Sequence, residues 1–180
     1  MRTLPKTFLV IDVESVGLHG QAFAVGGGLY TGNGTRVREF LYSCPPERAA
    51  GDPLGREWIG KNVPPMEPTH DTTDDIAQQF WMEWRRARTE DDAQLVADCL
   101  WPVEARFVLR AVMASQEDRC FQGPYPFYDV ATFMAAAGLD PLGTYDRLPE
   151  ELPAHNPLND SRQSARLLFV ALGRLPLMNV

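Results

Sequence analysis

The chain has 180 residues; 44% of them are apolar, 23% are charged, and the formal net charge at pH 7 is −7. These proportions are ordinary for a globular protein, and the length suits one domain with a hydrophobic core over residues 1–180. The acidic balance argues against a protein that coats duplex nucleic acid by bulk electrostatics. It leaves room for a protein that grips one strand end through bound cations, because the cations supply local positive charge.

No apolar run is long enough to span a membrane, and Met1–Lys6 lack the apolar region of a signal peptide. The three cysteines, Cys44, Cys99 and Cys120, are far apart and odd in number. They predict free thiols in a reducing compartment, rather than a disulfide framework or a zinc site. We therefore expect a cytoplasmic protein with no membrane partner.

The first predicted strand, Thr7–Val13, carries an apolar stretch into two acids, Asp12 and Glu14. Side chains alternate faces along a strand, so these two carboxylates point the same way and repel each other. A cation between them relieves the repulsion, and hard oxygen ligands favour Mg²⁺ or Mn²⁺. A solvated strand end explains the same short pattern without a metal.

Two further strands are predicted at Ala22–Tyr30 and Val37–Tyr42, and the turn residues Thr31–Thr35 between them indicate a hairpin. The first three strands therefore form an antiparallel meander. Glycines at 26–28 interrupt the second strand, but the Lys-Ser/Thr and the helix of a phosphate-binding loop do not follow them. They indicate close backbone packing beneath a bulky neighbour.

The proline-rich segment Cys44–His70 is predicted as a long connection with a short helical turn near Arg56–Gly60, and connections of this kind often border a site. A helix follows at Thr72–Arg88, where Thr72 and Asp75 resemble a capping box. The apolar residues of this helix predict a core-facing side, with stacking on nucleobases as the less favoured alternative. They are Ile76, Ala77, Phe80, Trp81, Trp84 and Ala87.

A fourth strand, Gln94–Ala97, ends in Asp98, and Pro102 fits the first position of a helix that runs to about Gln116. Glu104 lies in the first turn of that helix, where a favourable interaction with the helix dipole is the simple explanation for an acid.

The last third of the chain predicts a short strand at Pro124–Tyr128 and then a helix that Asp129 caps and that runs through Ala137. The final helix begins after Asn156 as N-cap and runs to about Leu172. We interpret Asp129 as structural.

His155 lies in the loop just before the final helix, and Asp160 lies in its first turns. A helix cap and a surface histidine would explain this pair taken by itself. The element order is β-β-β-α-β-α-β-α, and acids end the first strand, follow the fourth strand and begin the last helix. Three separated segments therefore bring acids that could converge on one side of a mixed sheet.

With these acids and this element order, the sequence resembles the DEDD 3′–5′ exonucleases, the family that includes ribonuclease T, oligoribonuclease and the DNA polymerase III proofreading subunit. Asp12 and Glu14 match the family's Asp-x-Glu on the first strand. Ser15 and the pair Gly17-Leu18 resemble the Thr and Gly-Leu that usually follow it.

His155 and Asp160 match the third motif of the family, a histidine followed by four residues and an aspartate, which marks the histidine subgroup (DEDDh). The order of strands and helices resembles the family's ribonuclease-H-like fold over nearly the whole chain. The resemblance implies an α/β (α+β) fold: a mixed sheet of about five strands, the first three antiparallel, flanked by helices.

The second motif departs from the family pattern, which places an aspartate just inside a helix. The helix alignment lands on Glu104, whereas Asp98 at the strand end keeps the residue type of the family. Strand ends aim at the site, which slightly favours Asp98 as the remaining metal ligand, and Glu104 stays the alternative.

The resemblance implies a metal-dependent exonuclease that trims single-stranded DNA or RNA from the 3′ end to nucleoside 5′-monophosphates. Two Mg²⁺ or Mn²⁺ ions would be held by the carboxylates, and His155 would take a proton from the attacking water. Ser15, Gly17 and Leu18 would line the pocket for the terminal nucleotide.

Arg106 and Arg162 are candidate phosphate contacts, against the simpler view that both are solvated surface arginines. The alternatives are an oligonucleotide-trimming exoribonuclease, a non-catalytic nucleic-acid- or partner-binding module of the same fold, and a generic nucleotide hydrolase. The sequence leaves open the choice between DNA and RNA, and whether the chain forms a homodimer or joins a polymerase or repair partner.

Overall fold

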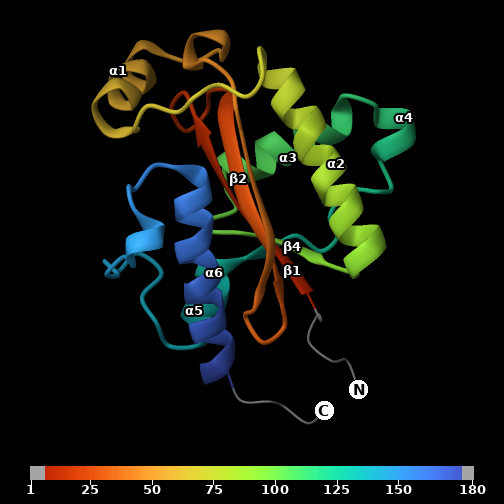
Figure 1. The fold of residues 1–180 in the computed structure, drawn as a ribbon, viewed down its shortest axis with the longest axis vertical. Helices are drawn as coiled ribbons and strands as arrows, with labels where there is room; N and C mark the ends of the chain where they lie inside the picture. Colours follow the sequence, from red (N-terminus) through yellow and green to blue (C-terminus); the bar gives the residue numbers. More distant parts are fainter. Residues whose placement is uncertain (1–6, 176–180) are drawn as a thin grey trace.

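The computed structural model describes residues 7–175 of the chain, and Figure 1 shows the arrangement of its elements. The strands are β1 (Thr7–Ser15), β2 (Ala22–Thr31), β3 (Arg36–Ser43), β4 (Gln94–Ala97) and β5 (Tyr128–Asp129). The α-helices are α1 (Pro53–Asn62), α2 (Thr73–Asp91), α3 (Val103–Met113), α4 (Gln116–Arg119), α5 (Val130–Ala136) and α6 (Pro157–Arg174). Two short 3-10 helices, Pro46–Arg48 and Pro149–Glu151, lie in connections.

The five strands form one mixed sheet in the order β3-β2-β1-β4-β5. The first three strands pair antiparallel, while β4 and β5 continue the sheet in parallel with β1. The predicted fold class is therefore confirmed. Parallel pairing brings the carboxyl ends of β1 and β4 to the same edge, where Ile11 pairs with Ala97 and the next residues are Asp12 and Asp98.

Helices cover both faces of the sheet, with α2 and α3 on one side and α5 and α6 on the other (Figure 1). The side chains of β1 alternate between the two faces of the sheet. Leu9, Ile11 and Val13 pack in the cluster that includes α2 and α3, while Phe8 and Val10 pack against α5 and α6. Residues two apart share a face, so the side chains at positions 12 and 14 point to the α6 side.

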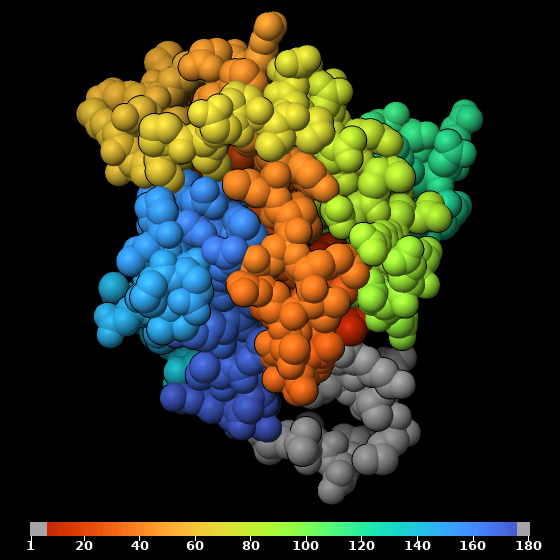
Figure 2. Space-filling model, in the orientation of Figure 1, coloured from red at the N-terminus to blue at the C-terminus, as the bar shows by residue number. Residues whose placement is uncertain are grey.

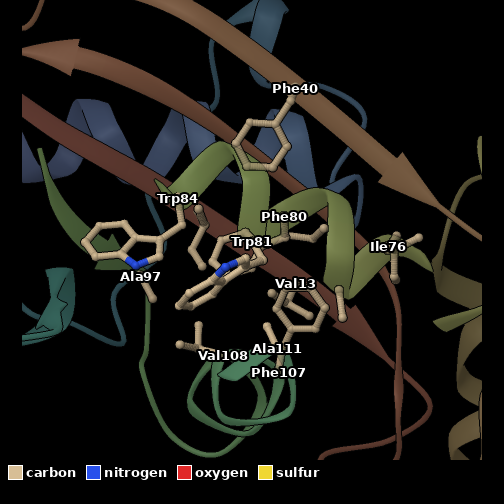
Figure 3. Packing of buried hydrophobic residues seen from close by; sticks show 14 of the residues in the cluster. Val13, Phe40, Ile76, Phe80, Trp81, Trp84, Ala97, Phe107, Val108 and Ala111 are labelled. Carbon is tan, nitrogen blue, oxygen red and sulfur yellow. The ribbon is translucent and has the colours of Figure 1, made fainter. Parts of the chain in front are cut away.

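The predicted core face of α2 is confirmed, because every residue assigned to it is buried. Figure 3 shows Trp81 and Trp84 enclosed with Phe107 and Val108 of α3. The capping box at Thr72 and Asp75 is also present. The rings of Phe80, Trp81 and Trp84 are buried in the core, so they are not available to stack on nucleobases.

Gly26 shows why β2 contains glycines. A Cβ at this position would come within 2.3 Å of the backbone nitrogen of Leu158, so the first turn of α6 rests directly on the strand. Gly26 pairs in register with Asp12 on β1. The close backbone packing expected at these glycines is therefore the contact between β2 and the first turn of α6. It places the start of α6 beside the acids of β1.

The segment predicted as a long connection contains a complete helix, α1, where only a turn near residues 56–60 was expected. Asp52 caps α1 by accepting a hydrogen bond from the nitrogen of Gly55 at 2.8 Å. Gly55 also touches the β1–β2 turn: a Cβ there would lie 2.6 Å from the nitrogen of Gly17. The helix was not predicted because its two glycines and the prolines around it are typical of loops. It packs at the end of β1.

Two other boundaries were wrong. The helix predicted to run from Pro102 to Gln116 is α3, which begins at Val103, ends at Met113 and is followed by the separate α4. The fifth strand was expected at 124–128, but β5 comprises Tyr128 and Asp129, because prolines lack the donor that strand pairing needs.

Asp129 has the predicted capping role: it accepts hydrogen bonds from the nitrogens of Thr132 at 2.6 Å and Leu100 at 2.8 Å. The three cysteines form no disulfide, as predicted. Within residues 7–175, no helix is both long enough and apolar enough to cross a membrane.

Candidate functional site

Two acids at the end of β1 begin the site. Asp12 and Glu14 share the strand face toward α6, and Glu14 is buried. Burial, together with the neighbouring Asp160, raises the pKa of Glu14 to about 7. Burial raises the pKa of Asp12 well above its usual range, and the charges of four further acids add to the effect.

The head of α6 supplies Asp160 and His155. Asn156 caps the helix by accepting hydrogen bonds from the nitrogens of Leu158 at 3.1 Å and Asn159 at 3.3 Å. His155 then takes a left-handed backbone conformation with φ 59°, which is uncommon for a residue with a side chain. This turn directs the backbone nitrogen of His155 to the carboxylate of Asp160, which accepts its hydrogen bond at 3.0 Å.

The imidazole of His155 reaches back over β1. Its Nδ1 lies 3.8 Å from Oε1 of Glu14, and its side chain is 42% exposed. One ligand atom from each of Glu14, His155 and Asp160 lies within 4.8 Å of the others. The two motifs that are 141 positions apart in the chain (14 and 155) therefore meet in one place.

Both second-motif candidates also reach this place. Burial raises the pKa of Glu104 to about 8, and Asp98 and Glu14 contribute to the rise, while backbone N–H groups of Glu104 and Val13 partly oppose it. Burial raises the pKa of Asp98 as well, and a hydrogen bond from Ser164 partly opposes that rise. Glu104 thus faces the β1 acids, whereas Asp98 also engages α6.

We call the five acids Asp12, Glu14, Asp98, Glu104 and Asp160 the carboxylate edge. All five have raised pKa values, and burial is the largest cause in each. Oxygen donors at this density, with one imidazole beside them, suit a hard divalent cation such as Mg²⁺ or Mn²⁺. A cation would relieve both the mutual repulsion and the cost of burial.

Arg147 is a member of the site that the sequence analysis missed. Its Nη1 lies 2.5 Å from Oδ1 of Asp160 and also donates to the carbonyl oxygen of Glu151 at 2.9 Å. Burial raises the pKa of Asp160, and the Arg147 hydrogen bond opposes the rise. Arg147 lies in an irregular loop with no periodic pattern, so no sequence signal marked it.

A pocket of about 390 Å³ opens beside Glu14. Ser15, Gly17 and Leu18 are among the residues that line it. Ser15 Oγ donates to the carbonyl oxygen of Gly17 at 2.8 Å, and Gly17 has φ 73°, which glycine adopts without strain. Leu18 is 66% exposed and offers an apolar surface at the rim.

Trp58 of α1 also lines this pocket, and its ring packs edge-to-face on His155 with centroids 4.8 Å apart. Figure 2 shows α1, in gold, lying directly above the blue segments that contain the head of α6. Sequence reasoning missed Trp58 because it did not find α1. A tryptophan in a predicted proline-rich loop near a site was the available signal.

The two candidate phosphate contacts differ in position. Arg162 is not at the carboxylate edge; its guanidinium makes two hydrogen bonds of 2.8 Å to Glu39 of β3. Arg106 is exposed and lines a second, smaller pocket next to the first. Arg162 was a candidate phosphate contact, and in the structure its guanidinium forms an ion pair with Glu39 instead.

No protein-family model matches the sequence, and a search of curated proteins gave no match. Solved structures do match. A zinc-bound complex of Escherichia coli exonuclease I with single-stranded DNA superposes with a TM-score of 0.65 at 14% identity, over 97% of this chain and 42% of that one. A second exonuclease I structure gives a TM-score of 0.60 at 14% identity, over 93% of this chain and 43% of that one.

A full-length 3′-exonuclease gives a TM-score of 0.50 at 14% identity, over 95% of this chain and 83% of that one. The chain spans about two fifths of the length of the exonuclease I chains. At this identity the likeness establishes the architecture, and the chemistry has to be argued from the side chains. The chain has the α/β fold found in these exonucleases.

Proposed function

We propose that the protein is a metal-dependent 3′–5′ exonuclease that hydrolyses single-stranded nucleic acid to nucleoside 5′-monophosphates. The observation that carries this proposal is the carboxylate edge: five buried or partly buried acids with raised pKa values beside one exposed imidazole. Mutual repulsion of this kind is costly in a folded protein, and it is common where a site is organised for a cation.

Asp12, Glu14 and Asp160 would hold two Mg²⁺ or Mn²⁺ ions together with a second-motif acid. We assign that fourth role to Glu104, because it interacts electrostatically with Asp12 and Glu14, whereas Asp98 is partly engaged by a hydrogen bond from Ser164. Asp98, which the strand-end argument slightly favoured, is the alternative. When bound, the ions would activate water and stabilise the charge on the departing oxygen.

His155 would take the proton of the attacking water. Its imidazole is anchored beside Glu14 by the turn that ties its backbone to Asp160, and it remains open to solvent for proton exchange. The pocket lined by Ser15, Gly17 and Leu18 would receive the terminal nucleoside, with the exposed Leu18 against the base. We retain one domain over residues 1–180 as part of this proposal.

A second candidate function is a non-catalytic nucleic-acid-binding module of the same fold. The pairing of Arg147 with Asp160 favours it, because a guanidinium already compensates one of the acids. A trimming exoribonuclease is a narrower version of the first proposal, in which short RNA is the substrate.

The decisive experiment is a time course with Mn²⁺ on 5′-labelled single-stranded DNA and RNA of the same sequence, with EDTA as control. A ladder that shortens from the 3′ end and disappears with EDTA would establish the activity and the preferred sugar. An intact strand with a correctly folded protein would instead favour the binding module.

A further inference from the structure

A second pocket of about 180 Å³ adjoins the first, and Ser15 and Val103 line both. Glu14 lines the first pocket but not the second, so the second pocket extends away from Glu14. Its other walls carry polar groups from Gln21 and Thr73. It is less than half the volume of its neighbour.

Two arginines of α3 complete this second pocket. Arg106 and Arg110 lie four residues apart and follow Val103 at helical spacing, so the three share one side of α3. Glu104 lies about 100° round the helix from Val103, toward the carboxylate edge. The same helix thus supplies an acid to the candidate metal site and two cations to the adjoining pocket.

The arginines near the site differ in whether an acid already pairs with their guanidinium group. Arg147 is bound to Asp160, and Arg162 is bound to Glu39. By contrast, Arg106 is exposed, and its guanidinium has no hydrogen-bond or ion-pair partner within residues 7–175. Over the same residues the guanidinium of Arg110 pairs with Asp74 alone, at 2.7 Å, and the side chain of Asp74 is 75% exposed.

We propose that the second pocket is a phosphate-binding subsite, in which Arg106 and Arg110 hold a phosphate group of the bound strand while the terminal nucleoside occupies the first pocket. This inference rests on the proposed function. The hydroxyl of Thr73 and the amide nitrogen of Gln21 add donors of the kind that phosphate accepts. A volume well below that of the first pocket suits a phosphate better than a second base.

The phosphate has two sources in a strand. A 3′-phosphate on the terminal nucleotide would lie beyond the nucleoside pocket, on the side away from the acids. A phosphodiester of a neighbouring nucleotide would reach the same pocket if the strand crosses α3. Both present phosphate oxygens to Arg106, and the end group of the strand distinguishes them.

The test measures binding, so that it does not depend on turnover. Fluorescence anisotropy would give the Kd of 5′-labelled dT8 ending in a 3′-hydroxyl or a 3′-phosphate, with Ca²⁺ added and strand length checked after each titration. The proteins are the wild type, Arg106→Ala, Arg106→Lys and Arg86→Ala. Arg86→Ala is the matched control, because it removes the same charge from an exposed helix position on α2.

We expect Arg106→Ala to weaken binding roughly 5- to 10-fold and to lower the slope of log Kd against log salt by about 0.7, as for one lost phosphate contact on a single strand. Arg106→Lys should recover part of the affinity, and Arg86→Ala should match the wild type. A loss confined to the 3′-phosphate strand identifies the terminal phosphate, and an equal loss on both strands identifies the phosphodiester.

Equal Kd values and salt slopes for Arg106→Ala and Arg86→Ala on both strands would overturn the subsite. The proposed function fails differently: the wild type would then leave both strands uncut in Mn²⁺ whatever the effect of Arg106. A phosphate effect without cleavage would keep the subsite and transfer it to the binding module.

Discussion

Two charged regions of this molecule make a useful contrast. The first is the carboxylate edge. The second is a groove of about 600 Å³ between the β2–β3 hairpin and α6, which we call the hairpin groove; its walls include Tyr30, Arg36, Glu151, Arg162 and Arg166. The groove is the larger hollow, and it also contains acids and arginines, so volume and charged residues do not separate the two.

Charge compensation separates them. Arg162 in the wall of the hairpin groove lowers the pKa of the adjacent Glu39 through a direct hydrogen bond. Burial alone would raise the pKa of Glu151, but hydrogen bonds from Arg166, at 2.6 and 2.8 Å, bring it below its usual value. At the carboxylate edge the pKa values rise instead, because burial raises all five and neighbouring acids add to the rise in every one except Asp160.

The contrast shows what each region does for the fold. The ion pairs of Arg162 with Glu39 and of Arg166 with Glu151 tie α6 to the hairpin and to the loop before α6. The raised pKa values at the carboxylate edge mean that ionising these acids costs stability, and a bound cation would lower that cost. Stability and candidate function therefore depend on different charge patterns. The helix α6 contributes to both, through Arg162 and Arg166 in one case and Asp160 in the other.

The largest expected effect is on cleavage when an acid of the carboxylate edge is removed. Asp12→Ala or Asp160→Ala should lower kcat by about 1000-fold or more, because each removes a ligand that the ions need. The fold should remain, since relief of repulsion offsets the lost side chain at position 12. Unchanged turnover of either purified variant on labelled oligonucleotide would contradict the two-metal assignment.

The next comparison decides the second-motif ligand within the carboxylate edge. If Glu104 is the ligand, Glu104→Ala should lose activity to the same degree as Asp12→Ala, while Asp98→Ala should retain most of it. Parallel kinetics and Mn²⁺ titrations of the two variants provide the measurement. The reverse ranking would establish Asp98 and show that residue type outweighs helix alignment.

His155→Ala should lower kcat by about 100- to 10,000-fold through loss of the general base. Metal affinity should fall much less, since the carboxylates stay in place. Isothermal titration with Mn²⁺ beside single-turnover kinetics separates the two effects. A His155→Ala protein that cleaves at the normal rate would remove the imidazole from the mechanism.

The pH dependence of stability should distinguish the regions without any mutation. Glu14 and Glu104 ionise near 4.5 in the unfolded chain but at about 7 and about 8 in the folded protein. The unfolded state therefore releases protons first, and stability of the metal-free protein should fall as pH rises from about 5 to 8, by roughly 3 kcal/mol from Glu14.

Thermal unfolding in EDTA at pH 5.5, 7 and 8.5 would measure this fall, and added Mn²⁺ should reverse it most strongly at pH 8.5. The titration of Glu39 and Glu151 acts at lower pH and in the opposite direction, because their pKa values are lowered. A Tm in EDTA that rises steadily from pH 5.5 to 8.5 would refute the raised pKa values.

The smallest expected effect comes from the hairpin groove. Glu151→Gln removes the charged partner of Arg166 and should lower the free energy of unfolding by about 2–3 kcal/mol. The shift in Tm on adding Mn²⁺ should equal that of the wild type, because no acid of the carboxylate edge has changed. Chemical denaturation tests the first statement, and thermal unfolding with and without Mn²⁺ tests the second.

Much of the fold was predictable because its signals are local. Alternating apolar residues mark β1, Asn156 and Pro157 mark the start of α6, and Thr72 with Asp75 marks the start of α2. Each of these patterns depends on backbone geometry within a few residues, so no tertiary information was needed. The helix α1 was missed because Gly55 and the surrounding prolines look like loop residues.

The candidate site divides in the same way. The sequence by itself determined which acids stand at strand ends and helix starts, and the spacing of His155 to Asp160 follows from one helix turn and its cap. Only the tertiary structure decided that Trp58 covers His155, that Arg147 binds Asp160, and that Glu104 turns toward the β1 acids. The contacts of Trp58 and Glu104 join segments far apart in the chain, and that of Arg147 crosses an irregular loop. Tertiary packing, here of α6 on Gly26 and of α1 on Gly17, sets these positions.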